Sequence, residues 1–558
     1  MSFSRFLFVS LAAVSVAAAP PPQVAALDSA AAARVRGHVE FLADDLLEGR
    51  GTGTRGHEIA AAYVASQFRS LGLQPAGENG SWYQWVPLRR ARLVEGKTSI
   101  SMSTGGSSFA VSEFELGLRP SLTETTRMID AGMVFVGYGL SDTALGLDDY
   151  AGLDVRGKIV VVLGGTPDGL NSEIAAHLGS DKTRAAAAHG AVGMLQIGGR
   201  RNTPLPVGAR AASLYSKRPA IDWIKAGKAG SDSGSVRVTL SASSAMIERL
   251  FAGAPKSLAA VHAEAGRKGV RPRGFALRPR LSIRSESAWE DFRSPEVIAK
   301  LPGADPKLAG EHVILMGHLD HLGLSTGHPD HVGLSAHAKP GADAINNGAL
   351  DNAAGVATMI EAAHAFVASG KSPRRSVMFI ANTGEELGLI GADYFAAHPT
   401  VPLASIVGLV DLDMPLLLYP FSDVIAFGAE HSTVATAVAD AGRSMGVSVT
   451  PDPMPKQSIF VRSDHYRFVT RGIPAILLMT GYANGGEAQW KNFLGKVYHT
   501  PGDDLAQKID WGAAARYGDL NYRISRMLAD ADLRPVWYRG VYFGDRFAPN
   551  APRAERRP

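Results

Sequence analysis

The 558-residue sequence contains no cysteine. This absence excludes disulfides, thiol proteases, cysteine-ligated zinc and iron–sulfur clusters. Any transition metal would therefore be held by histidine and carboxylate side chains. If the chain is exported, the lack of disulfides favours a Gram-negative periplasm over an animal extracellular space.

The sequence also lacks a strong charge and a long hydrophobic run. The formal net charge is +4, and Lys and Arg cluster only in residues 551–558, which we expect to be a solvated tail. We therefore expect no nucleic-acid binding. Because no apolar run reaches the roughly 18 residues of a transmembrane helix, we expect no stable membrane insertion. The oligomeric state is not indicated.

The N-terminus has the pattern of a secretory signal. Arg5 precedes an apolar run over residues 6–19, which is followed by three prolines and small residues up to Ala26. A basic start, a short apolar stretch and small residues before the mature chain are typical of a signal peptide, and this stretch is too short to span a bilayer. The sequence predicts a signal peptide over residues 1–26 and a secreted or periplasmic protein.

The rest of the chain predicts two kinds of structure. Residues 95–285 contain short β-rich segments and an alanine-rich helix, which indicates an inserted module, whereas helices and strands alternate after residue 290. Such alternation predicts an α/β sheet with helices on both faces. The predicted strands are 133–136, 158–163, 236–240, 313–316, 377–381, 406–410 and 475–479, and the predicted helices include 57–71, 183–189 and 355–367.

Polar side chains that could bind metal follow most of the strands predicted after residue 290. Ligands of open α/β sheets bind beyond the carboxyl ends of the strands, so these side chains are expected to converge. They are His318, Asp320 and His321 after the first strand, Glu385 and Glu386 after the second, Asp411 and Asp413 after the third, and Tyr498 and His499 beyond the last, with Asp351 before a helix.

Each signal has an ordinary explanation when taken alone. Asp351 could simply cap a helix, and Glu385 and Glu386 could form a solvated helix start. Together, however, two histidines and three carboxylates at one sheet edge would repel unless cations neutralised them. One carboxylate between two ions, with a histidine and a carboxylate completing each site, is the composition of a two-metal centre with ions about 3.5–4 Å apart.

The motifs in this order resemble those of the M28 peptidases, in particular the bacterial leucyl-aminopeptidase-like enzymes. The inserted module resembles a protease-associated (PA) domain, and residues 41–50 are similar to the segment that opens many M28 domains. The M28-like motifs are Met316–Gly323, Asn347–Gly355, Thr383–Glu386, Leu412–Met414, Ser463–His465 and Tyr498–Pro501, and the PA-like ones are Asp154–Val162 and Ala188–Met194.

The resemblance implies a three-layer α/β/α mixed-sheet zinc exopeptidase domain with an inserted β-rich PA domain. The implied boundaries are a signal peptide at 1–26, peptidase domain at 27–115, PA-like domain at 116–284, peptidase domain at 285–540 and tail at 541–558.

The resemblance also implies two Zn²⁺ ions per chain. His318 and Asp413 would hold one ion, Glu386 and His499 the other, and Asp351 would bridge them. By the same resemblance, Glu385 is the expected general base, the Asp320 carboxylate would orient the ring of His318, and Tyr498 would donate to the oxyanion. The bond between Asp351 and Asn352 is expected to be cis.

The implied activity is hydrolysis of N-terminal residues of peptides by a two-zinc-activated hydroxide. A carboxypeptidase is an alternative, and it would need basic residues such as Arg462 or Arg467 to hold a substrate carboxylate. A glutaminyl cyclase fits less well, because cyclases usually hold one zinc and lack a PA insertion. A non-catalytic receptor-like homologue is disfavoured, because that branch loses zinc ligands.

The polar segment 325–346 contains His328, His331 and His337. It could be a lid or a third metal site, although exposed loop histidines are the simpler expectation.

Overall fold

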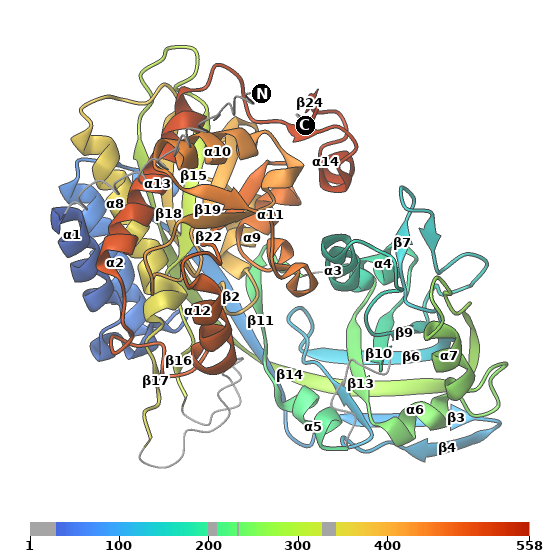
Figure 1. Ribbon diagram of the computed structural model, residues 1–558. Coiled ribbons are helices and arrows are strands. Elements are labelled where there is room, and N and C mark those ends of the chain that lie inside the picture. The colour runs from blue at the N-terminus through green and yellow to red at the C-terminus, as the bar shows by residue number, and fades with distance from the viewer. Residues whose placement is uncertain (1–28, 199–208, 232–233, 326–341, 557–558) are drawn as a thin grey trace, which may run out of the picture.

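The computed structural model describes residues 29–198, 209–231, 234–325 and 342–556, which form two lobes (Figure 1). The predicted signal peptide and residues 326–341 of the histidine-rich segment lie outside these ranges, so both interpretations stay predictions. Within the described ranges, no helix combines the length and the apolar character needed to cross a membrane.

The larger lobe contains a mixed β-sheet. Its central strands run parallel and are flanked on both sides by antiparallel pairings. Most of the central strands are buried along their whole length, as expected for Val- and Ile-rich strands covered on both faces. The order is β2 (Tyr83–Leu93), β14 (Phe275–Leu301), β18 (Ser376–Asn382), β15 (His312–His318), β19 (Ile406–Asp411), β22 (Ala475–Thr480), β20 (Asp423–Phe427) and β21 (Ser448–Thr450).

Helices cover both faces of this sheet, which confirms the predicted three-layer arrangement. The helices α1, α2, α8 and α13 lie on one side of the sheet and α9 and α11 on the other (Figure 1). Local signals fix some of the helix starts: the Thr54 hydroxyl accepts from the amide of His57, and Asp510 accepts from that of Ala513. The bounds are α1 (Ser29–Leu42), α2 (Arg55–Ser70), α8 (Ala354–Ala368), α9 (Ile390–Ala397), α10 (Val434–Ser444), α11 (His465–Val469) and α13 (Trp511–Asp530).

The second lobe is a β-rich unit with its own hydrophobic core. This core includes Phe135, Leu195 and Val261, and it is separate from the core of the larger lobe. The strands are β3 (Ser99–Thr104), β4 (Ser107–Ala110), β5 (Leu116–Leu118), β6 (Thr126–Phe135), β9 (Ile159–Leu163), β10 (Gly193–Ile197) and β13 (Val238–Ala242). The helices are α3 (Ser172–Ser180), α4 (Lys182–Ala188), α5 (Ala209–Lys217), α6 (Ser244–Leu250) and α7 (Leu258–Ala265).

The strand β14 belongs to both lobes and corrects the predicted boundaries at 116 and 284. Its first half pairs with β3 and β6 of the second lobe, and its second half pairs with β2 and β18 of the larger lobe. The second lobe therefore begins near residue 99, and the sheet is continuous between the lobes through this strand. The sequence shows only alternation along 275–301, and alternation does not reveal which of two cores covers a strand.

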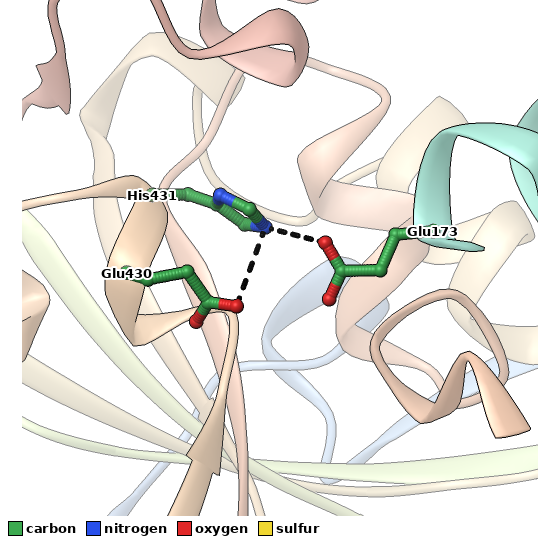
Figure 2. Close-up of side chains that lie close together, drawn as sticks. All are labelled: Glu173, Glu430 and His431. Atoms are coloured by element: carbon green, nitrogen blue, oxygen red, sulfur yellow. Dashed lines mark hydrogen bonds and ion pairs between the residues drawn. The ribbon is translucent and has the colours of Figure 1, made fainter. Parts of the chain in front are cut away.

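A second crossing comes from β11 (Ala220–Lys225), which lies inside the predicted insertion but pairs with β2 of the larger lobe. Side chains also join the lobes: Glu173 Oε2 of α3 lies 3.0 Å from His431 Nε2, with Glu430 Oε1 4.0 Å from the same nitrogen (Figure 2). Because Glu430 is half exposed and Glu173 and His431 already hydrogen-bond to each other, this group is a polar contact between the lobes.

The predicted tail begins with a helix that packs on the second lobe, while Ala551, Pro552, Glu555 and Arg556 of the charged stretch are exposed. The short helix α14 (Tyr542–Phe547) inserts Phe543 among aromatic side chains, and the Tyr542 hydroxyl donates to Asp142 of the second lobe at 2.8 Å. The strand β24 (Arg553–Ala554) then pairs with β23 (Trp537–Tyr538). Arg553 also donates to the carbonyls of Gly544 and Ala548, which joins the charged stretch to α14.

Candidate metal centre

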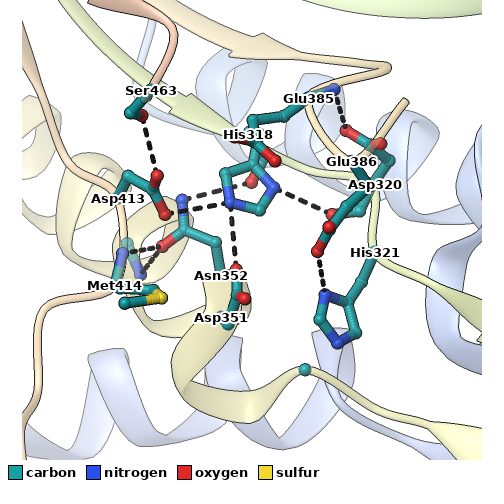
Figure 3. Close-up of polar contacts among 12 residues, drawn as sticks. His318, Asp320, His321, Asp351, Asn352, Glu385, Glu386, Asp413, Met414 and Ser463 are labelled. Atoms are coloured by element: carbon teal, nitrogen blue, oxygen red, sulfur yellow. Dashed lines mark hydrogen bonds and ion pairs between the residues drawn. The ribbon is translucent and has the colours of Figure 1, made fainter. Parts of the chain in front are cut away.

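The predicted ligands meet at the carboxyl end of the parallel strands (Figure 3). His318 is the last residue of β15, and Asp413 follows β19 by two residues. Glu386 lies just beyond β18, and Asp351 lies in the turn that leads into α8. The parallel register of the strands therefore brings segments almost 100 residues apart in the sequence to one point.

Asp351 faces a different histidine with each of its two oxygens. His318 Nε2 lies 3.1 Å from Asp351 Oδ1 and 3.0 Å from Asp413 Oδ1. His499 Nε2 lies 3.2 Å from Asp351 Oδ2 and 3.3 Å from Glu386 Oε2. The structure thus brings all five predicted ligands together in the predicted pairs, with Asp351 between them.

A sixth side chain, His321, lies beside the second pair and was not among the predicted ligands. Its Nδ1 is 2.6 Å from Glu386 Oε1, and His321, Asp351 and Glu386 are close enough to hold one ion. The signal was present in the sequence, because a second histidine follows Asp320 directly, but nothing in the pattern shows where its ring lies.

The electrostatics of this group fit bound cations. Burial raises the pKa of Glu386 to about 8, and the charge of Asp351 adds to the effect. Burial alone would lower the pKa of His318, but Asp413 and Asp351 raise it well above its usual value. A buried cluster of carboxylates is costly without compensating charge, and imidazole and carboxylate donors are ligands that Zn²⁺ takes in proteins. The donor set therefore fits two zinc ions.

Asp320 supports the site differently from the prediction. The ring of His318 contacts the backbone carbonyl of Asp320, with Nδ1 3.0 Å from the oxygen, whereas the predicted partner was the carboxylate. That carboxylate accepts from the hydroxyl of Thr52 at 2.8 Å and from the amide of Glu385 at 3.3 Å. Asp320 thus connects the segment of His318 to the segment of Glu385. The position of Asp320 in the sequence does not show whether its carbonyl or its carboxylate contacts His318.

Further buried groups hold the ligands in place. The Ser463 hydroxyl lies 2.7 Å from Asp413 Oδ2, and the two carboxylate oxygens of Asp503 accept from the amides of Leu350 and Asp351. The bond between Asp351 and Asn352 is cis, which confirms the prediction. Neither Asp503 nor Ser463 was assigned a role from the sequence.

Arg50 holds together the turns around the metal centre. Its buried guanidinium donates to the carbonyls of Leu42, Leu319, Asn347 and Gly348, which lie on three separate segments. These hydrogen bonds link the segment 41–50, which ends at Arg50, to two of the metal-binding motifs. The sequence did not indicate this link.

Arg50→Ala is expected to lower the free energy of unfolding by about 3 kcal/mol or more, since each buried carbonyl left without a donor costs about 1–3 kcal/mol. Arg50→Lys should lose most of the same stability, because an ammonium cannot reproduce the planar fork. Urea unfolding measures both values. The control is Arg36→Ala, at an exposed ion pair with Glu40, which should change stability by about 0.5 kcal/mol or less; equal losses at both positions would contradict this role.

A cavity of about 250 Å³ opens beside the ligands. Glu385 lines this cavity and makes no ion-pair contact with the predicted histidine ligands. Burial, together with the charge of Glu386, raises the pKa of Glu385 well above its usual value. Tyr498 also lines the cavity and stacks on His499, with ring centroids 3.7 Å apart. The remaining lining residues are Asp351, Asp413, Met414, Gln457, Ile459, Arg462, Ser463, Leu477, Met479, Trp490 and Leu494.

Residues 296–525 match the family model described as peptidase family M28. The match confirms, for this part of the chain, the resemblance that the motifs indicated. It includes all five predicted ligands, Glu385 and Tyr498.

Curated relatives and solved structures show more distant similarity. The vacuolar membrane proteases of Lachancea thermotolerans and Candida glabrata are 27% and 30% identical over 126 and 110 residues, which are 23% and 20% of this chain. These stretches span about a tenth of the relatives' own length (10% and 9%).

The aminopeptidase from Aneurinibacillus sp. strain AM-1 has 20% identity and a TM-score of 0.45, with 89% of this chain and 93% of that chain covered. The zinc aminopeptidase BSAP from Bacillus subtilis has 17% identity and a TM-score of 0.42, with 90% and 96% covered.

Proposed function

We propose, from the M28 match of residues 296–525 and the geometry of the metal centre, that this chain is a secreted two-zinc exopeptidase that removes N-terminal residues from peptides. The observation that carries the proposal is the position of Asp351. Its two oxygens face two separate histidine–carboxylate pairs, as a carboxylate that bridges two ions must.

Each catalytic role falls on a side chain that the site positions. Two Zn²⁺ ions held by His318, Asp413, Asp351, Glu386 and His499 would lower the pKa of water and polarise the scissile carbonyl. Glu385 would take a proton from the attacking water and pass one to the leaving amine.

Tyr498 is the proposed donor to the oxyanion. Its ring stacks on His499 and borders the same cavity as Glu385, so its hydroxyl can approach a carbonyl placed between them. Burial raises the pKa of Tyr498, which keeps the hydroxyl protonated and able to donate a hydrogen bond.

The basic candidates for a carboxypeptidase differ in position. Arg462 lines the cavity, whereas two of the carboxylates that line it, Asp351 and Asp413, are assigned to zinc and are not free to bind a substrate amine. The other basic candidate, Arg467, lines a different pocket and donates to the carbonyl of Gly388. One of the two basic candidates therefore reaches the cavity, and the substrate panel distinguishes an aminopeptidase from a carboxypeptidase.

A substrate panel tests the proposal. Aminoacyl-nitroanilides and amidated peptides should be cleaved, whereas N-acetylated peptides should not, since an aminopeptidase acts on a free N-terminal amine. Elemental analysis of the mature protein should return about two zinc ions per chain. Cleavage that needs a free C-terminus would point to a carboxypeptidase, and a single zinc with cyclisation of N-terminal glutamine would point to a cyclase.

A further inference from the structure

His321 is held rigidly against the metal centre. Its amide donates to the carbonyl of Arg50 at 3.2 Å, and its side chain is fully buried. The ring lies against Gly348, where an added Cβ would come within 2.6 Å of the His321 Cδ2 atom. The absence of a side chain at Gly348 therefore makes room for this ring next to Glu386.

The polar atoms at this contact have no hydrogen-bond partner. His321 Nδ1 and Glu386 Oε1 are 2.6 Å apart, yet neither atom makes a hydrogen bond with any group in the described ranges. The two atoms are thus close without being aimed at each other. Two unsatisfied buried polar atoms cost about 1–3 kcal/mol each, so a neighbouring group that satisfies both is expected.

A shared cation explains this arrangement. Ligands of one ion lie close together, but each points at the ion and not at its neighbour. The ring of His499, which faces the other oxygen of Glu386, has its centroid 5.8 Å from that of His321 at an interplanar angle of 72°. The two imidazoles therefore flank the Glu386 carboxylate.

We propose that His321 is a third imidazole of the metal centre and binds, through Nδ1, the same ion as Glu386 and His499. The proposal rests on the two-zinc function above and adds a ligand to it. The ion beside Glu386 then has four protein ligands, Asp351, Glu386, His499 and His321, and the ion beside His318 has three. Closed coordination is typical of structural zinc and an open position of catalytic zinc, so the two ions differ in role.

The competing explanation is that His321 only orients Glu386 by donating a hydrogen bond from Nδ1. His321→Asn separates the two roles, because an asparagine amide can replace an Nδ1–H donor but is a poor zinc ligand. If His321 binds zinc, His321→Asn and His321→Ala should both weaken one of the two zinc sites by about 100-fold or more, beyond the roughly 10–100-fold typical of losing an outer partner. If it only orients Glu386, the asparagine variant should keep the wild-type zinc affinity.

Zinc affinity is measured by competition with a chromophoric chelator, which does not depend on activity. His364→Asn is the matched control, since His364 is partly exposed on α8 and away from the ligands. Urea unfolding of the metal-free variants shows whether they fold.

X-ray absorption of the zinc-loaded wild-type protein provides a second measurement that needs no variant. Three imidazoles shared between two ions are expected, and two imidazoles would overturn the proposal. A wild-type protein that binds fewer than two zinc ions would instead contradict the two-zinc function, so the two failures are distinguishable.

Discussion

Glu385→Gln is expected to lower kcat by about 10²–10⁴-fold while leaving the zinc content unchanged. The reason is geometric: Glu385 borders the cavity, but the histidine contacts of the centre are made by Asp351, Glu386 and Asp413. Glutamine keeps the size and one oxygen of the side chain but cannot take up a proton. Steady-state kinetics on an aminoacyl-nitroanilide, with elemental analysis of the same preparation, measures both effects.

Glu40→Gln is the matched control for this substitution. Glu40 is exposed on α1 and, among the described residues, pairs only with Arg36 of the same helix, so kcat and zinc content should both stay at wild-type values. If Glu385→Gln turned over at the wild-type rate, the base would have to be another residue. If it lost zinc, Glu385 would be a ligand rather than the base.

Asp351→Ala is expected to abolish activity and to remove zinc from both sites. Each oxygen of Asp351 faces one of the two histidine–carboxylate pairs, so its removal takes a ligand from each ion at once. The loss of zinc affinity should exceed the roughly 10–100-fold that follows removal of an outer partner. Zinc titration of the metal-free protein is the direct measurement.

Asp351→Asn refines the test because it keeps the shape and one oxygen of the side chain. It should retain the site that this oxygen faces and weaken the other, which gives a zinc content between those of wild type and Asp351→Ala. If Asp351→Ala kept two tightly bound ions, Asp351 would not be the bridge, and the two-zinc mechanism would need a different carboxylate.

The candidates at this sheet edge were readable from the sequence because most of them follow a regular strand or precede a helix, and the choice of five ligands among them came from the resemblance to the M28 motifs. Parallel strands end at the same edge, so a histidine after 313–316 and a carboxylate after 406–410 converge whatever the intervening residues are. His321 and Asp320 could not be assigned in this way. The role of His321 depends on whether its ring turns towards Glu386, and the role of Asp320 depends on whether its carbonyl or its carboxylate faces His318. Contacts from distant segments decide both.

The same distinction applies to the fold. The sequence by itself determined the α/β class, the position of the main strands and helices, the two-lobe character and the group of residues from which the metal centre is proposed, because periodicity and motifs are local properties of the chain. Only the tertiary structure decided that β14 runs through both lobes, that β11 returns to the larger sheet, and that Arg50 joins three segments through their carbonyls. Strand pairing and the packing of a buried side chain depend on residues far apart in the sequence, and no local pattern records which of the possible partners is chosen.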